Sequence, residues 1–147
     1  MAHIEKYRKD FILLAEAGFI AINQADEDAA IKLFKAAELL DPSNPLPKIG
    51  VGYLHLCKLE LKQAAKCFEE ILAADPHNEM AKTFLGLSLS LNPKDVDRGE
   101  KVLSESAKDS HDPMIKDLAH NALVFVEKFV KKAPSPAELQ KSPKHKK

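Results

Sequence analysis

The chain has 147 residues, which is enough for one domain with a substantial hydrophobic core. Its composition combines 45% hydrophobic residues with only 6% aromatic residues and no Trp, which favours close-packed helices over strands. The formal net charge is zero, so the chain as a whole lacks the clustered basic surface of nucleic-acid-binding proteins, and we expect no nucleic-acid partner.

The cysteine content and the hydropathy pattern exclude further classes. Cys57 and Cys67 are too few for a disulfide framework and lack the paired spacing of a zinc site. Both occur at apolar positions of a helical pattern, so we expect buried thiols. The N-terminus does not resemble a signal peptide, and no stretch approaches the ~20 apolar residues that span a bilayer. These features predict a soluble, cytoplasmic protein without membrane insertion.

Apolar side chains at helical spacing predict one long first helix over residues 3–24. Asp26 is the expected N-cap of the next helix, because a side-chain oxygen there can accept a hydrogen bond from the first turn. This second helix is expected to stop before Pro42, since the residue that precedes a proline avoids the α region. The same spacing predicts further helices over residues 45–58, 61–73, 78–91 and 113–132.

The helices recur in pairs with a period of 34 residues. The residues that keep this spacing are Gly18, Gly52 and Gly86; Ala30 and Ala64; Phe34 and Phe68; Asp41-Pro42 and Asp75-Pro76; and Asn44 and Asn78. Such a period indicates copies of one helix–turn–helix unit, which must stack because no unit can bury its apolar face alone. We expect the small residues to let the two helices of a unit approach closely, and the phenylalanines to fill the gap between successive units.

The third copy departs from this pattern. Gly99 comes one residue late, Leu103 takes the aromatic position, and Asp112-Pro113 follows the preceding Asp-Pro pair by 37 residues instead of 34. We interpret these shifts as one extra residue in the loop at 92–94 and two extra residues before Asp112. The lone helix that follows is expected to cap the stack, because terminal repeats meet water on their outer face.

The last fifteen residues, 133–147, have a different character. They contain three Pro and four Lys against one Glu, which gives a net charge of +3 and leaves the remainder of the chain at −3. With little apolar surface to bury, this segment is predicted to be a disordered basic tail.

The recurring glycine, alanine, aromatic and proline positions resemble the tetratricopeptide repeat (TPR) family. The resemblance covers three copies, at about 11–44, 45–78 and 79–112, with the capping helix at 113–132, so that residues 1–132 form one TPR domain. It implies an all-α fold in which stacked helix–turn–helix units form a right-handed superhelix. The first helix of each unit would line a concave groove that binds peptides and carries out no chemistry.

The resemblance also implies which side chains face the groove. Nearly all of them are apolar, and they are Ile12, Ala15, Phe19 and Ile22 in the first copy, Leu46, Ile49, Tyr53 and Leu56 in the second, and Met80, Thr83, Leu87 and Leu91 in the third. Co-chaperones of this family hold a terminal carboxylate with Lys and Asn at comparable places, which are absent here. An apolar groove favours an amphipathic helix of a client protein instead.

Small three-copy proteins with such a groove resemble the TPR chaperones of bacterial type III secretion. The resemblance implies a chaperone that keeps a needle subunit soluble before export, either alone or together with a second small co-chaperone. A translocator chaperone, a generic TPR scaffold and a homodimer that fills its own groove are the alternatives.

An enzyme is the alternative from a different class, and the sequence disfavours it. The six histidines are scattered, no two form an i, i+4 pair with a nearby acid, and no glycine-rich phosphate loop occurs. His55 lies among packing positions, which predicts a core histidine with its hydrogen bonds satisfied. We therefore expect no catalytic residues, no cofactor and no metal site.

Overall fold

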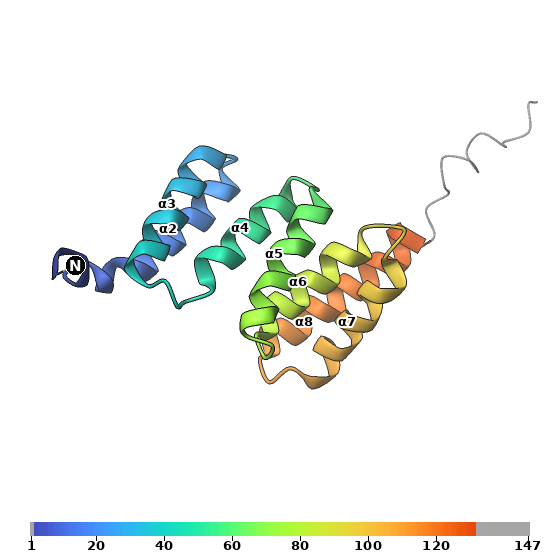
Figure 1. Ribbon diagram of the computed structural model, residues 1–147. Coiled ribbons are helices and arrows are strands. Elements are labelled where there is room, and N and C mark those ends of the chain that lie inside the picture. The colour runs from blue at the N-terminus through green and yellow to red at the C-terminus, as the bar shows by residue number, and fades with distance from the viewer. Residues whose placement is uncertain (1, 132–147) are drawn as a thin grey trace, which may run out of the picture.

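The computed structural model describes residues 2–131, and every regular element in this range is helical. This confirms the predicted all-α class for that part of the chain. Figure 1 shows helical hairpins that follow one another along one direction, with the N-terminus at one end of the stack and α8 near the other. The predicted tail, residues 133–147, lies outside the described residues.

Three helical hairpins and one further helix make up the stack. They are α2 (Phe11–Asn23) with α3 (Glu27–Leu40), α4 (Leu46–Cys57) with α5 (Leu61–Ala74), α6 (Glu79–Ser90) with α7 (Val96–Asp109), and α8 (Pro113–Phe125). The predicted ranges 45–58, 61–73 and 78–91 agree with α4, α5 and α6 to within one residue. The helical spacing of apolar residues therefore located these helices well.

The chain does not begin with the continuous helix predicted over residues 3–24. The short helix α1 (Ala2–Glu5) ends in a turn, a single 3-10 turn η1 (Arg8–Asp10) follows, and α2 begins only at Phe11. Residues 3–9 are all exposed. A short terminal segment without a surface to pack on gains little helical stability, because packing of an apolar face supplies most of it.

The first two hairpins turn in the same way at their tips. Ala25 and Leu59, which are 34 residues apart, both have φ of 58° and so adopt the left-handed conformation that ends a helix. Asp26 is the N-cap of α3, as predicted, and its Oδ1 accepts a hydrogen bond from the Ala29 amide at 3.0 Å. A three-residue connection thus suffices to reverse the chain.

Phe34 and Phe68 fill the gaps between successive hairpins, as predicted. Both rings are fully buried. Phe34 is held between α2 and α4, because a Cβ atom added at Gly18 would lie 2.5 Å from its ring and one added at Gly50 would be closer still. Phe68 stacks on Phe84 of α6, with the ring centroids 5.6 Å apart. Each phenylalanine therefore locks one hairpin onto the next.

The third hairpin uses smaller side chains at its crossing. Gly99 of α7 meets α6 so closely that an added Cβ would lie 2.7 Å from the carbonyl oxygen of Gly86 and would overlap Ser90. Leu103 takes the place of the aromatic residue and packs over Gly86. The close approach of the two helices at small residues is thus found here, with glycine on both sides.

Asp112 and Pro113 do not have the role that their 37-residue spacing suggested. The two earlier aspartates of this kind are C-caps that follow α3 and α5. Asp112 is instead the N-cap of α8 and accepts a hydrogen bond from the Met114 amide at 2.9 Å, and Pro113 is the first helical residue. The first residue of α8, Pro113, comes 34 residues after the first residue of α6, Glu79. The helix starts therefore keep the period here, and the predicted insertion of two residues before Asp112 is wrong.

The final helix closes the stack over α7. Ala119 and Ala122 pack against the fully buried Leu103. The range predicted as one helix, 113–132, is α8 followed by a π-helical segment η2 (Val126–Lys131). Val126 in this segment is fully buried, and Lys131 forms an ion pair with Glu100 of α7 at 2.7 Å.

Candidate functional site

Three half-buried aromatic side chains form a row across the hairpins. Phe19 of α2 and Tyr53 of α4 have ring centroids 6.1 Å apart, and those of Tyr53 and Phe84 of α6 are 5.6 Å apart. At one end Phe19 meets Phe34 edge to face at 5.1 Å, and at the other Phe84 stacks on Phe68. Such ring pairs contribute about 1 kcal/mol each beyond their buried area. This aromatic row (Phe19, Tyr53, Phe84) joins the three hairpins and leaves part of each ring exposed.

Phe84 was not among the predicted groove residues. It lies one helical turn before Leu87, the residue that the 34-residue period aligns with Tyr53. The signal for it in the sequence is one aromatic residue in the middle of a helix whose other large apolar side chains are aliphatic. The groove positions implied by the resemblance missed it, because the reach of a large ring, and not its position in the repeat, brings it beside Tyr53.

The twelve predicted groove residues differ in exposure. Ile12 is 52% exposed and Met80 is 38% exposed. A second group is half-buried and comprises Phe19, Leu46, Tyr53, Leu87 and Leu91. The third group is buried and comprises Ala15, Ile22, Ile49, Leu56 and Thr83. Only the first two groups have surface that a partner could contact.

The expectation that the five buried residues line a groove is therefore corrected. Ile49 and Leu56 belong to the hydrophobic cluster around Phe68, and Ala15 packs at the base of the first hairpin. The hydroxyl of Thr83 donates a hydrogen bond to a backbone carbonyl one turn earlier in α6, at 2.8 Å. These side chains are buried between neighbouring helices. The repeat pattern alone does not predict how those helices pack.

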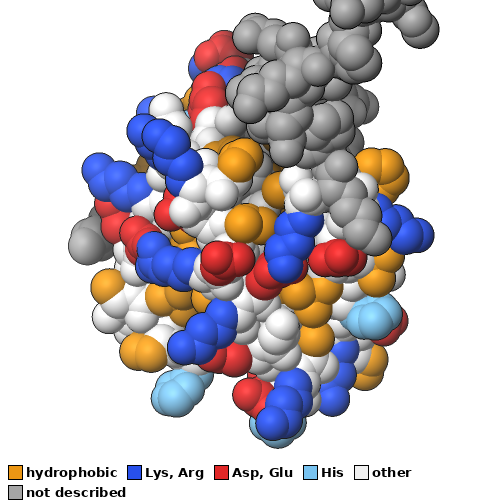
Figure 2. Space-filling view, turned by 90° about the vertical axis from the view of Figure 1, so that its right-hand side faces the viewer, with side chains coloured by type: hydrophobic (Ala, Val, Ile, Leu, Met, Phe, Trp, Pro, Cys, Tyr) orange, Lys and Arg blue, Asp and Glu red, His pale blue; other side chains and the backbone are white. Residues whose placement is uncertain are grey.

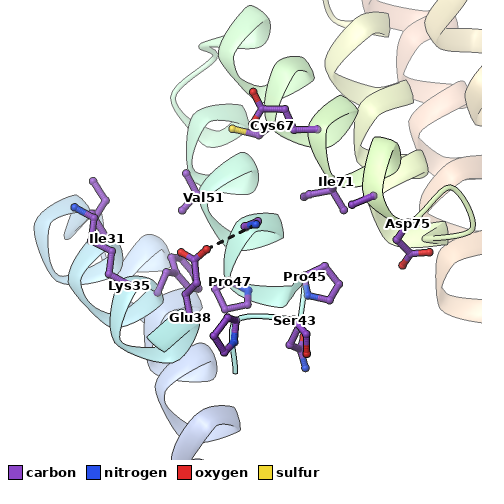
Figure 3. A pocket seen from close by; sticks show the side chains of 16 residues that line it. Ile31, Lys35, Glu38, Ser43, Pro45, Pro47, Val51, Cys67, Ile71 and Asp75 are labelled. Carbon is purple, nitrogen blue, oxygen red and sulfur yellow. Dashed lines mark ion pairs between the residues drawn. The ribbon is translucent and has the colours of Figure 1, made fainter. Parts of the chain in front are cut away.

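A separate hollow of about 520 Å³ lies between the first two hairpins, on α3, α4 and α5 (Figure 3). Val51 and Ile71 contribute apolar surface, and the ion pair of Lys48 with Glu38, at 3.8 Å, bridges α4 and α3. Cys67 also lines the hollow, and burial raises the pKa of its thiol, so the thiol is a poor nucleophile at neutral pH. Because apolar side chains and paired charges both line this hollow, its chemistry does not indicate one class of ligand.

The polar side chains show structural pairing. His55 Nδ1 lies 2.5 Å from Glu60 Oε2, and Lys58 forms an ion pair with the same carboxylate at 2.9 Å. The hydrogen bond from His55, followed by that from Lys58, lowers the pKa of Glu60. His55 is thus half-buried at the surface, where it is hydrogen-bonded to Glu60, and it is not the predicted core histidine.

The expected burial of both thiols is also corrected. Cys57 is exposed, because it is the last residue of α4 and lies at the tip of its hairpin. Among residues 2–131 no three His, Cys, Asp or Glu side chains are grouped as metal ligands would be.

Comparison with protein-family models, with curated proteins and with solved structures found no match for this chain. Within the described part of the chain, none of the helices combines the length and the apolar character needed to cross a bilayer.

Proposed function

We propose that this protein is a non-enzymatic chaperone or adaptor that holds an amphipathic helix of a client protein against the aromatic row and its aliphatic neighbours. The observation that carries the proposal is the row itself, in which three hairpins each contribute one partly exposed ring. An amphipathic helix presents apolar side chains at i, i+3, i+4 and i+7, and it can span several such positions at once. The exposed Ile12 lies seven residues before Phe19 on α2, and the exposed Met80 lies four residues before Phe84 on α6, so helical spacing places each on the same face as the ring.

The finer architecture is part of the proposal. We infer a TPR-like right-handed superhelix with α2, α4, α6 and α8 on its inner side. Support comes from the 34-residue recurrence of helices and hairpin tips, and from the contacts that each of these helices makes with the next one. In a curved stack, the helices on the inner side approach one another more closely than those on the outer side.

We further propose that the client is a needle subunit of a bacterial type III secretion system, held in the cytoplasm before export. The basis is the resemblance in size, repeat number and apolar character to the chaperones of that system. A translocator client, or a scaffold role without a secretion substrate, would use the same surface.

The test is co-expression of the full chain with a tagged needle subunit or a tagged translocator, followed by pull-down. Ile12→Asp and Met80→Asp are the informative variants, because their side chains are largely exposed and their replacement leaves the core intact. We expect each to reduce capture of the needle subunit at least tenfold, since buried apolar anchors of an interface cost ~2 kcal/mol when lost. Phe19 and Tyr53 are less informative, because they pack on rings of neighbouring hairpins.

Leu59→Asp is the matched control, because Leu59 is an exposed leucine in the turn after α4 and belongs to none of the helices that carry the aromatic row. It should retain full capture. If the protein captures the translocator and not the needle subunit, the client in the proposal changes, but the proposed binding surface does not. Equal capture by Ile12→Asp, Met80→Asp and the parent protein would show that the client binds elsewhere.

A further inference from the structure

An aromatic pair is exposed where α8 passes into η2. Phe125 is 46% exposed and Phe129 is 60% exposed, and their ring centroids lie 4.9 Å apart. Val124 beside them is exposed as well, whereas Val126 is fully buried. The terminal helix of a stack needs a polar outer face for solubility. Two exposed rings in contact on such a face therefore indicate a surface that binds something else.

A lysine completes this surface. Lys128 lies between the two phenylalanines in the sequence, is exposed, and forms no ion pair with any other residue of the range 2–131. An ammonium group beside two rings gives the surface both an apolar and a cationic part. We call Val124, Phe125, Lys128 and Phe129 the C-terminal patch.

The patch is confined to one end of the capping helix. Met114 is exposed at the start of α8, but the exposed polar residues Asp117 and Asn121 lie between it and the patch in the sequence. Lys131 forms an ion pair with Glu100. Figure 2 looks onto this end of the stack and shows hydrophobic side chains among both basic and acidic ones on the visible described surface. The described surface around the patch therefore has mixed charge, and a net attraction must come from the residues that follow.

The sequence from residue 127 to residue 147 supplies a strong positive charge. It contains seven Lys, two Glu and no Arg, which gives a net charge of +5 and leaves the other 126 residues at −5. The aromatic pair lies at the start of this segment, so one partner would meet both, and that partner must be anionic. A cluster of about four to eight basic residues on or beside an amphipathic helix is the sequence pattern of proteins that bind anionic lipids.

The exclusive use of lysine distinguishes a lipid surface from an acidic protein as this partner. Arg pairs with carboxylates in a fixed fork geometry and is the residue of choice for ion pairs in protein interfaces, whereas Lys acts as a flexible point charge. The segment has seven Lys and no Arg. A fluid array of lipid phosphates requires no fixed pairing geometry, so lysines suit it.

The small size of the apolar surface distinguishes the same two partners. A Phe side chain can bury about 200 Å², so two rings that are roughly half exposed offer about 200 Å². A stable protein interface needs about 800 Å² on each partner. At a bilayer surface, a shallow apolar anchor is sufficient when electrostatic attraction to anionic lipids adds to it.

We propose that the C-terminal patch and the basic residues after it dock the protein on the surface of an anionic lipid bilayer. Phe125 and Phe129 enter the boundary between headgroups and acyl chains, and Lys128 lies at the level of the lipid phosphates. The lysines that follow add electrostatic attraction, each increasing the affinity about fivefold when it is near the surface. The docking uses no residue of the aromatic row, so a membrane-bound molecule can still hold a client helix.

Co-sedimentation of the full chain with lipid vesicles tests the proposal. We expect binding to phosphatidylcholine vesicles that contain about one-third phosphatidylglycerol, and at least about tenfold weaker binding to phosphatidylcholine alone. Raising the salt from about 0.1 M to about 1 M should release most of the protein, because the Debye length falls from about 10 Å to about 3 Å. The chain lacks Trp, so Phe129→Trp introduces a single indole fluorophore. Its emission should shift to shorter wavelength when the anionic vesicles are added.

Phe125→Gln/Phe129→Gln should weaken binding to the anionic vesicles at least about tenfold, because the exposed ring surface no longer leaves water. Both side chains are roughly half exposed, so this variant should keep its helical circular dichroism. If it does not fold, Phe129→Gln serves alone and should weaken binding about threefold or more. Leu13→Gln/Leu39→Gln is the matched control, because it makes the same kind of change at two exposed apolar residues of the first hairpin. It should bind like the parent protein.

Truncation after Lys131 removes five Lys and one Glu and should abolish binding at about 0.1 M salt. The proposal is overturned if the parent protein binds the anionic vesicles no better than phosphatidylcholine alone. It is overturned equally if Phe125→Gln/Phe129→Gln binds like the parent protein, because the lysines would then act without the patch. Retention of the parent protein on immobilised poly-glutamate without vesicle binding would overturn it in favour of an acidic protein partner.

Discussion

The ring of Phe34 lies directly on the backbone of Gly50, in a gap that no other residue type at position 50 would leave. Phe34 belongs to the first hairpin and Gly50 to the second, and the ring is buried to 1% exposure. Gly50 is outside the 34-residue set of small residues, since that set contains Gly18 and Gly52. The contact between the first two hairpins therefore depends on an extra glycine that the period does not predict.

We expect Gly50→Ala to destabilise the protein by about 2 kcal/mol, because its methyl group must displace a fully buried ring. The better helix propensity of alanine offsets only part of this cost. Chemical denaturation of the purified variant measures the change. Combining Gly50→Ala with Phe34→Leu should cost less than the sum of the single variants, which isolates the clash as the cause. Strict additivity would contradict the interpretation.

Removal of the last helix should unfold or aggregate the protein. Truncation after Asp112 deletes Ala119 and Ala122, which cover the fully buried Leu103, and also the ion pair of Lys131 with Glu100. Thermal melting and light scattering report the effect. Truncation after Lys131 is the control, because it leaves α8 and η2 in place, and it should melt like the parent protein. A soluble protein with a normal melt after the longer deletion would show that α8 does not stabilise the stack.

Leu59→Gly should stabilise the protein by about 0.5–1 kcal/mol. Leu59 has φ of 58°, a conformation that costs a residue with a Cβ atom about 1–2 kcal/mol and costs glycine nothing. Glycine also raises the conformational entropy of the unfolded chain, which offsets part of this stabilisation. Leu59 is exposed, so the loss of its side chain removes little packing. A rise in melting temperature checks the prediction, and Ala25→Gly at the equivalent turn should act in the same direction.

Glu79 should make the stability of the protein depend on pH in the acidic range. Its carboxylate accepts hydrogen bonds from the Ser110 hydroxyl at 2.7 Å and the His111 amide at 3.2 Å, and these bonds hold its pKa below the usual value of 4.5. A pKa that is lowered in the folded state contributes stability above the unfolded pKa, and this contribution is lost as the pH falls through the folded value.

We therefore expect Glu79→Gln to melt below the parent protein at neutral pH, with a difference that narrows as the pH falls below 4.5. The two proteins should approach each other as the pH falls through the lowered pKa of the folded carboxyl, because the parent side chain is then protonated. Melting temperatures of both proteins across this range provide the measurement. A difference that stays constant with pH would mean that the side chain acts through packing and not through its charge.

Several elements could be predicted because their signals are local. Asp26 caps α3, α3 ends before the proline that follows it, and the bounds of α4, α5 and α6 follow from apolar spacing within each helix. The two phenylalanines between hairpins were also predictable, because a residue that recurs with the repeat has the same neighbours in each copy.

The role of Asp112 shows where such reasoning fails. An Asp-Pro pair follows a helix as readily as it starts one, and only the hydrogen bond to the Met114 amide distinguishes the two. The candidate site was predictable to the same limited degree. The resemblance to the repeat family indicated Phe19 and Tyr53, but it missed Phe84 and included side chains such as Ile49 that are buried.

By itself, the sequence determined the all-α class of residues 2–131, the bounds of several helices, and which phenylalanines lie between hairpins. These properties depend on residues close together along the chain or repeated at one spacing. The tertiary structure decided which apolar side chains remain exposed, because exposure depends on the size and reach of residues on neighbouring helices. Ile49 and Ile12 each lie on the first helix of a hairpin. Ile49 is buried in the cluster around Phe68, whereas Ile12 is exposed to solvent.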